Sequence, residues 1–159
     1  MYEPNSTAST EDRVHPYSSL TNADRDSTIS EPDVPDWWKQ ALQRIVTLLD
    51  LPENWDSYGA KPINRQAAYN AIQILQQIAP SGMPAPTIVP TAKGYLQFEW
   101  HTGGIDLEFE VLSPVKISAS YEDTVRGIEW DRDLDYNLMP LAEVLKLLTF
   151  HARKMDNAI

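Results

Sequence analysis

The sequence predicts an α+β protein in which helices and an antiparallel sheet occupy separate stretches of the chain. Apolar residues recur at helical spacing over residues 37–49 and 64–78, and from about residue 87 they instead alternate with polar ones. Helical spacing returns after Pro140. Because helices and strands are segregated rather than interleaved, the pattern favours α+β over a parallel α/β sheet.

Two helices joined by a loop are predicted before the strands. The first begins at Asp36, the expected N-cap, and is ended by Pro52. The second begins after Asn64, also a capping residue, and runs to about Ile78. Prolines and a glycine then interrupt residues 80–86, which predicts an irregular connection to the first strand.

A meander of four to five strands is predicted next. It starts with a short strand at residues 87–90, whose proline indicates an edge strand or a strand end. The strongest local pattern is a hairpin over residues 95–111 with one apolar and one acidic face. A further strand is predicted at residues 117–121 and a last one at residues 125–130, followed by a polar connection at residues 131–135.

A C-terminal helix with Pro140 in its first turn is predicted to pack on one face of the sheet. The alternation in the strands leaves the opposite face open to water. We therefore expect residues 35–159 to form a single α+β domain. The inner stripe of its last helix is expected to comprise Leu141, Val144, Leu145, Leu148 and either His151 or Ala152.

Residues 1–34 are predicted to form a disordered acidic tail. They are polar and rich in proline, and their few large apolar side chains are isolated, so little apolar burial offsets the entropy of ordering. Two interpretations stay open: a solubilising leader, or a segment that folds onto a basic partner. Charge is also concentrated further along, because residues 99–135 hold ten acidic and three basic residues, a net charge of −7.

Composition excludes several classes of function. The 159 residues carry a formal net charge of −10, which argues against a surface that tracks nucleic-acid phosphates. The absence of cysteine excludes disulfides, thiolate zinc sites and cysteine nucleophiles. No apolar run approaches the roughly 20 residues of a membrane span, no secretory-signal pattern opens the chain, and no phosphate-binding glycine loop occurs. We expect a cytoplasmic protein without a cofactor, a nucleic-acid partner or a membrane contact.

The acidic face of the hairpin is the first candidate site. A tight turn at residues 101–104 pairs residues whose numbers sum to 205, which places Glu99 opposite Asp106, with Glu108 and Glu110 continuing the row. Carboxylates that face each other directly on a sheet repel. Three explanations stay open: a bound divalent metal, a basic protein partner, or exposed charge that keeps an open sheet face from aggregating.

His101 adds an imidazole to this row at the tip of the hairpin. Together with Glu99 and Asp106 it forms a candidate metal site for hydrolysis, because carboxylate oxygens and imidazole nitrogens are suitable ligands. The other histidines, His15 and His151, lie in the tail and near the chain end. The sequence therefore offers few histidines for a Ser–His–acid catalytic triad.

The loop at residues 54–62 is the second candidate site. In a structural interpretation, Trp55 fills the junction between the helices and Asp56 accepts hydrogen bonds from loop N–H groups. Tyr58 then packs, and Gly59 supplies a positive φ. In a binding interpretation, the two aromatic rings anchor a partner and the carboxylate pairs with its arginine.

Trp37 and Trp38 are adjacent, so a single helix face cannot bury both. One of them is therefore a candidate anchor for a second copy of the chain, which would make the protein a homodimer.

Two motifs in the chain resemble a family of small bacterial proteins. They are LPENWDSYGAKP at residues 51–62 and GYLQFEWHTGGIDLEFE at residues 94–110. The family carries a loop of the Asn-Trp-Asp-x-Tyr-Gly-Ala type followed by a hairpin of the Leu-Glu-Trp-His…Gly…Asp-Leu-Glu type, and no activity is established for it. The resemblance covers roughly residues 48–125. It implies a single bacterial cytoplasmic domain and transfers no catalytic residue.

These observations favour a non-enzymatic protein-interaction module of the antitoxin, immunity or inhibitor kind, which binds a basic partner through the acidic sheet face. The alternative is a metal-dependent hydrolase that uses Glu99, His101 and Asp106. No catalytic residue is predicted for the interaction module. Its predicted partner-binding residues are Glu99, Asp106, Glu108, Glu110, Trp55, Asp56 and Tyr58.

Overall fold

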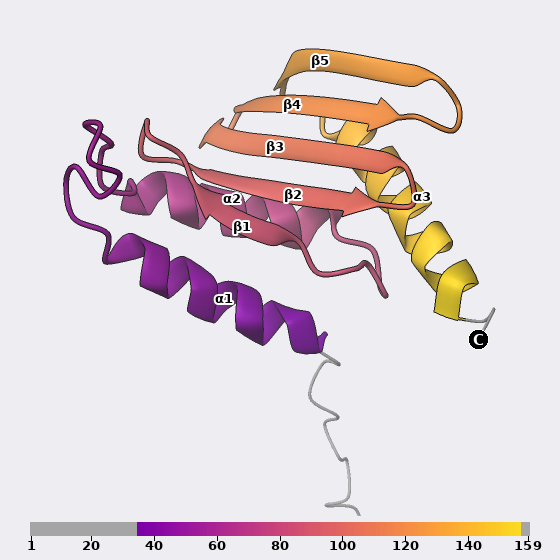
Figure 1. Cartoon of the computed structure of the whole chain (residues 1–159), viewed down its shortest axis with the longest axis horizontal. Helices are drawn as coiled ribbons and strands as arrows, with labels where there is room; N and C mark the ends of the chain where they lie inside the picture. The colour runs from indigo at the N-terminus through magenta and orange to yellow at the C-terminus, as the bar shows by residue number, and fades with distance from the viewer. Residues whose placement is uncertain (1–34, 157–159) are drawn as a thin grey trace, which may run out of the picture. The chain divides into compact units, whose positions relative to one another are not determined.

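The computed structural model describes residues 35–156, and in this range three helices accompany a five-stranded antiparallel sheet (Figure 1). The predicted α+β class and antiparallel sheet are thus confirmed. The predicted disordered tail, residues 1–34, lies outside the described residues. In chain order the elements are helices α1 (Asp36–Leu49) and α2 (Arg65–Ile78), strands β1 (Thr87–Pro90), β2 (Leu96–Thr102), β3 (Ile105–Ser113), β4 (Lys116–Asp123) and β5 (Ile128–Asp135), and helix α3 (Met139–Asp156).

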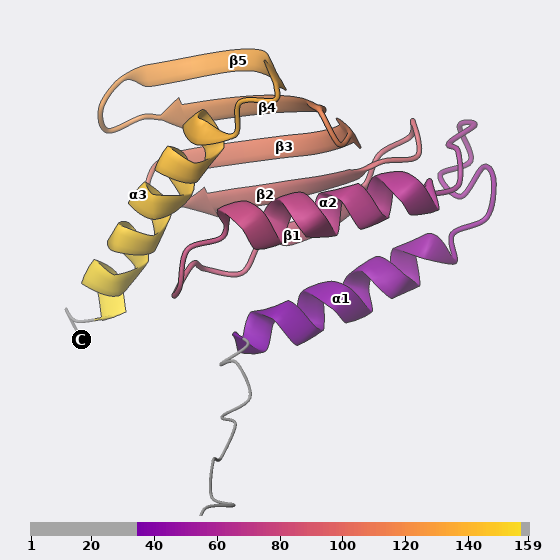
Figure 2. The same ribbon diagram turned by 180° about the vertical axis from the view of Figure 1, so that it is seen from behind.

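The strands follow one another in space in the order β1 to β5. Helices α2 and α3 lie on one face of this sheet, and α1 lies beside β1 (Figures 1 and 2). The Nε–H of Arg44 in α1 donates to the carbonyl oxygen of Ile88 in β1 over 3.1 Å. The guanidinium of Arg153 in α3 donates to the Ser81 carbonyl over 2.7 Å. None of the helices in the described part of the chain combines the length and the apolar character of a membrane span.

The starts of the first two helices test the capping predictions. The Asn64 side chain accepts the N–H of Ala67 over 3.0 Å and caps α2, as predicted. The N-cap of α1 is Pro35 rather than the predicted Asp36, because the Pro35 carbonyl already accepts the N–H of Trp38 over 2.9 Å. Asp36 is therefore the first residue inside the helix.

The two adjacent tryptophans share their burial. Trp37 and Trp38 are both half-buried and pack against the core. Their rings meet edge to face, with centroids 5.3 Å apart. The helix thus covers part of each ring, and neither tryptophan stands fully exposed on the surface.

The core lies between the sheet and the helices, and α1 contributes Ala41, Ile45 and Leu48 to it. The Phe109 ring is stacked between Phe98 and Trp100, with centroid distances of 5.1 and 5.9 Å. These rings alternate with polar residues along β2 and β3, so these two strands present an apolar face. Helix α3 packs on that side through the predicted stripe, of which Leu141, Val144, Leu145 and Leu148 are buried and His151 and Ala152 are half-buried.

The register of the β2–β3 hairpin differs from the prediction by two residues. The observed partners have numbers that sum to 207, so Glu99 faces Glu108 and not Asp106. A shift of two residues leaves every side chain on its predicted face, because the side-chain period of a strand is two. The predicted acidic row therefore survives with different partners.

The turn explains this register. Only Gly103 and Gly104 lie in the turn, with φ angles of +60° and +78°, and Thr102 pairs directly with Ile105. Two-residue hairpin turns with positive φ at both positions match the right-handed twist of the strands. The sequence prediction assigned four residues, 101–104, to the turn, and therefore paired Trp100 rather than Thr102 with Ile105.

The last strand lies later in the chain than predicted. The prediction was residues 125–130, whereas β5 runs from Ile128 to Asp135. The buried Asp123 carboxylate accepts the N–H groups of Val125 and Arg126 over 3.0 and 2.9 Å and thereby folds these residues into a turn. Residues 131–135, predicted as a polar connection, are instead the second half of a strand at the edge of the sheet.

Candidate functional site

Carboxylates line the face of the sheet opposite α2 and α3, on four adjacent strands. Every second residue of β2 to β5 points to this face, and the strand register aligns them across the sheet. The four carboxylates predicted from the hairpin all lie there. We call this surface the acidic face, and its carboxylates are Glu99, Asp106, Glu108, Glu110, Glu122, Glu129, Asp131, Asp133 and Asp135.

One row of titratable side chains crosses the whole acidic face near the β2–β3 turn. His101 on β2 faces Asp106 on β3, which faces Glu122 on β4, which faces Glu129 on β5. The same four residues line a surface depression of about 620 Å³. Three carboxylates and one imidazole thus share a concave patch on otherwise regular sheet.

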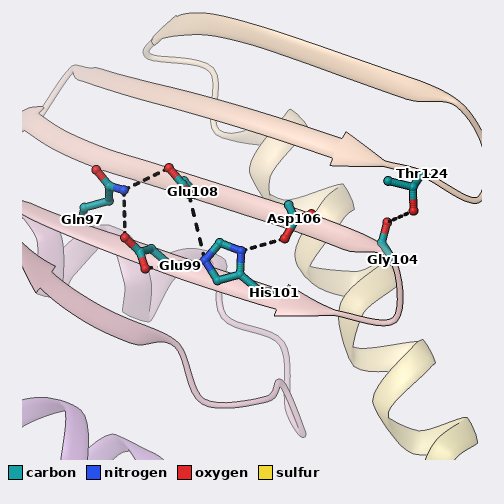
Figure 3. Close-up of polar contacts among 7 residues, drawn as sticks. All are labelled: Gln97, Glu99, His101, Gly104, Asp106, Glu108 and Thr124. Carbon is teal, nitrogen blue, oxygen red and sulfur yellow. Dashed lines mark hydrogen bonds and ion pairs between the residues drawn. The ribbon is translucent and has the colours of Figure 1, made fainter.

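Polar groups of the chain itself compensate the carboxylates on β2 and β3 (Figure 3). The Gln97 amide donates to Glu99 over 2.9 Å and to Glu108 over 3.0 Å, so it bridges two carboxylates that face each other. The Thr91 hydroxyl donates to Glu110 over 2.6 Å. These bonds offset part of the repulsion that directly opposed carboxylates experience.

His101 supplies the remaining compensation. Its Nδ1–H donates to Asp106 Oδ1 over 2.7 Å, and its Nε2 lies 3.6 Å from Glu99 and 4.0 Å from Glu108 (Figure 3). The hydrogen bond to Asp106, with a smaller contribution from Glu99, raises the pKa of His101 above its ordinary value of 6.5. The neighbouring carboxylates thus favour the protonated form of the ring.

The half of the acidic face on β4 and β5 has less compensation. Lys116 pairs with Asp133 over 3.2 Å. Within residues 35–156, Glu122, Glu129 and Asp131 form no ion pair. All three are exposed, and Glu122 faces Glu129 directly. Unpaired negative charge is thus concentrated on the two strands at one side of the sheet.

These carboxylates are the part of the site that the sequence prediction missed. The sequence predicts a strand that ends at residue 121, before Glu122, and a polar connection at residues 131–135. The signal that could have found them is the acidic residue at every second position from 129 to 135. Arg132 breaks the apolar half of this alternation, but its guanidinium lies 4.5 Å from the centroid of the Trp130 ring and covers that ring on the other face of the strand.

The loop between α1 and α2 is held together mainly by its own backbone and Asp56. The Asp56 carboxylate accepts the N–H groups of Tyr58 and Ala60 over 2.8 and 3.0 Å, and these bonds lower the pKa of Asp56. Half-buried Trp55 donates its ring N–H to the Lys61 carbonyl over 3.2 Å. The expectation that Tyr58 packs is wrong. Although the Tyr58 N–H donates to Asp56, the residue is 94 % exposed.

This loop lies at the other end of the sheet from His101. The Lys61 N–H donates to Ala92 and the Asn64 N–H donates to Gly94, so the loop is tied to the β1–β2 turn (Figure 1). The predicted partner-binding residues therefore fall into two groups. The hairpin carboxylates are brought together, whereas Trp55, Asp56 and Tyr58 form a separate feature.

Side-chain geometry in the described range does not support the alternative metal site. No group of three or more histidine, aspartate or glutamate side chains in residues 35–156 is arranged to hold a metal ion. Glu99, His101 and Asp106 are instead connected in pairs, by the hydrogen bond from His101 to Asp106 and the 3.6 Å contact between His101 and Glu99.

Comparisons of the chain with protein-family models, with curated proteins and with solved structures find no match. Fold and site together define an α+β protein with an acidic sheet face.

Proposed function

We propose that the protein is a cytoplasmic, non-enzymatic interaction module that binds a basic protein through the acidic face, in the manner of an antitoxin, an immunity protein or an inhibitor. The observation that carries the proposal is that carboxylates from four adjacent strands, β2 to β5, share one face of the sheet, and that those on β4 and β5 are exposed and largely unpaired in the described residues. Lysine and arginine side chains of a partner complement such a surface.

The charge pattern supports a protein partner over a nucleic acid. Phosphates would meet like charge on every strand from β2 to β5, whereas cationic side chains would relieve the repulsion between opposed carboxylates. The contact between Glu122 and Glu129 is the clearest case, because the two side chains face each other without a cation beside them in residues 35–156. Binding a cation there removes an unfavourable interaction and adds a favourable one.

A deca-lysine peptide tests the proposal with a defined probe. We expect calorimetry to detect binding at low salt, with an affinity that falls steeply as salt rises. The triple variant Glu122→Gln, Glu129→Gln, Asp131→Asn should weaken binding by about tenfold or more. The matched control neutralises three carboxylates outside strands β2 to β5, Glu11→Gln, Asp50→Asn and Glu53→Gln, and therefore makes the same change in net charge.

Equal weakening by the two triple variants would show that net charge, rather than the acidic face, attracts the peptide, and would overturn the proposal. Absence of binding at low salt would also overturn it. A pull-down from the native cell then asks for the physiological partner, which is expected to be basic and to dissociate as salt is raised.

A further inference from the structure

The two edges of the sheet differ, and the difference indicates how a partner docks. We propose that an extended segment of the basic partner, with lysine or arginine at every second position, adds to the sheet as a sixth strand beside β5. This inference rests on the proposed function and specifies its geometry. Strand addition of this kind obtains affinity from main-chain hydrogen bonds and specificity from alternate side chains.

The β1 edge is closed to such an addition. Strand β1 has four residues, and Pro90 at its end has no N–H to donate. The carbonyl of Ile88 already accepts a hydrogen bond from Arg44 of α1, which packs alongside. A short strand, a proline and a covering helix are all means by which proteins block a sheet edge.

The β5 edge has its main-chain groups directed outward. Tyr136 donates its N–H to the Val115 carbonyl over 3.1 Å. The two residues continue the register of β4 and β5, in which Lys116 faces Asp135. The hydrogen-bonded pairs of this ladder therefore contain the even-numbered residues of β5. Bonded and non-bonded pairs alternate in an antiparallel ladder. The N–H and C=O groups of Glu129, Asp131 and Asp133 therefore point away from β4, where the described part of the chain places no further strand.

The side chains of these same residues determine which partner fits. Glu129, Asp131 and Asp133 project onto the acidic face. If the added strand runs antiparallel to β5, a residue that hydrogen-bonds to one of them projects its own side chain on the same face. Three partner residues at alternate positions would thus lie beside three carboxylates, and lysine or arginine satisfies all three.

The intervening partner residues would face the opposite side of the sheet. There a groove of about 600 Å³ lies between β5 and α3, and its apolar lining includes Trp130, Val144 and Leu147. Arg126, Arg132, Lys146 and Glu143 also line it. Aliphatic side chains fit this groove, whereas further lysines would meet three cationic residues and a single carboxylate. The complementary segment therefore alternates basic and aliphatic residues.

Charge argues against two other occupants. A second copy pairing β5 with β5 would bring the carboxylates of residues 129–135 of both chains together, which is unfavourable. The chain's own residues 1–34 hold seven acidic and two basic residues, so their net charge opposes binding at the same edge. Both occupants are nevertheless outcomes that the experiment below can reveal.

The test uses the full chain and the peptide Ac-GKVKVKG-NH2. The first control, Ac-GKKKVVG-NH2, has the same composition without alternation. Two further peptides carry N-methyl groups, either on the lysines, whose N–H groups would bond to β5, or on the valines, whose N–H groups would face away. We expect the parent and the valine-methylated peptide to bind about tenfold or more tightly than the other two.

Amide hydrogen exchange provides the structural readout. Binding of the parent peptide should slow the exchange of the Glu129, Asp131 and Asp133 amides. Asp131→Pro should weaken binding more than Asp131→Asn, because both remove the charge but only proline also removes the outward N–H. Proline there leaves the β4 ladder intact, since that N–H does not bond to β4.

Each outcome decides between the two proposals. If all four peptides bind equally, the acidic face binds basic chains without strand addition, so this inference fails while the proposed function stands. If none binds at low salt, both fail. If the outward amides of β5 are already protected from exchange in the free monomer, the chain's own tail occupies the edge. If they are protected only in a dimer, a second copy occupies it. Either result would overturn the inference.

Discussion

His101 and Asp106 face each other across the β2–β3 hairpin, and the Nδ1–H of His101 donates to Oδ1 of Asp106 over 2.7 Å. This bond is the largest cause of the raised pKa of His101. Glu99 contributes less, from 3.6 Å on the other side of the ring. When protonated, His101 adds positive charge to a surface rich in carboxylates, and its titration reports the state of the carboxylates around it.

The contribution of each carboxylate can be separated by NMR titration of the His101 ring. Asp106→Asn should lower the pKa of His101 most, because it replaces the charged acceptor of the 2.7 Å bond. Glu99→Gln should lower that pKa by a smaller amount. A larger effect for Glu99→Gln would contradict the arrangement described.

Stability should depend on pH through the same group. The pKa of His101 is raised in the folded state, so its stabilising contribution is fully present below the ordinary value of 6.5 and is lost as pH rises through the raised pKa. The free energy of unfolding of His101→Gln should therefore differ from that of the parent most near pH 6 and least in the alkaline range. Because the side chain is 48 % exposed, the difference should be at most about 1 kcal/mol. Urea titrations at a series of pH values measure it, and a difference that grows with pH would be inconsistent with this assignment.

Neutralising one opposed carboxylate should stabilise the free protein. Glu129→Gln removes the repulsion with Glu122 and should raise the free energy of unfolding by a few tenths of a kcal/mol at low salt. The gain should shrink as salt screens the charges. The matched control Asp133→Asn instead removes the partner of Lys116 and should bring no gain. Equal gains from both variants would mean that general charge reduction is responsible.

The buried carboxylate at the β4–β5 turn should be important for stability. Asp123 is 2 % exposed and accepts two backbone N–H groups, so Asp123→Ala should lower the free energy of unfolding by about 1–3 kcal/mol. Asp123→Asn keeps an acceptor oxygen and should cost less. Chemical denaturation distinguishes the two variants. Equal losses of stability in the two variants would indicate that the ion pair of Asp123 with Arg126, 3.7 Å away, matters more than the hydrogen bonds.

Two glycines with similar backbone angles offer a comparison of strain with crowding. Gly59 and Gly94 have φ angles of +95° and +88°. A Cβ on Gly59 would meet nothing within 4 Å, whereas one on Gly94 would lie 2.7 Å from the Pro62 carbonyl oxygen. Gly59→Ala should therefore cost about 1–2 kcal/mol of unfolding free energy, from strain alone.

Gly94→Ala should cost roughly 1–3 kcal/mol more, because a backbone carbonyl must move. Thermal denaturation monitored by circular dichroism compares the two variants. Similar thermal midpoints for the two variants would show that the Pro62 carbonyl moves away from the added methyl group at little cost.

Much of the fold follows from local patterns. The Asn64 cap, the segregation of helices from strands, and the alternation of β2 and β3 are all decided by residues close in sequence. The faces of Glu99 and Asp106 were also predictable, because an error of two residues in register leaves a side chain on its face.

The features that escaped prediction depend on more distant interactions or on turn geometry. Asp123 sets the start of β5 through bonds inside a turn, and no apolar pattern reveals them. Arg132 occupies an inward position because the neighbouring Trp130 ring accepts its guanidinium. As a result the sequence prediction recovered the compensated half of the acidic face and missed the exposed half on β4 and β5.

The carboxylates of β5 point out of the plane of the sheet, whereas its outward main-chain groups point along the plane, away from β4. The two kinds of group would therefore act on different rates of partner binding. Long-range attraction by the side chains would govern how fast a partner arrives, so the association rate would vary with ionic strength. Short-range bonds to the backbone would govern how long the partner stays, so the dissociation rate would be nearly independent of salt. Substitutions of the acidic side chains would therefore act mainly on the association rate, whereas removal of an outward main-chain group of β5 would shorten the lifetime of the complex.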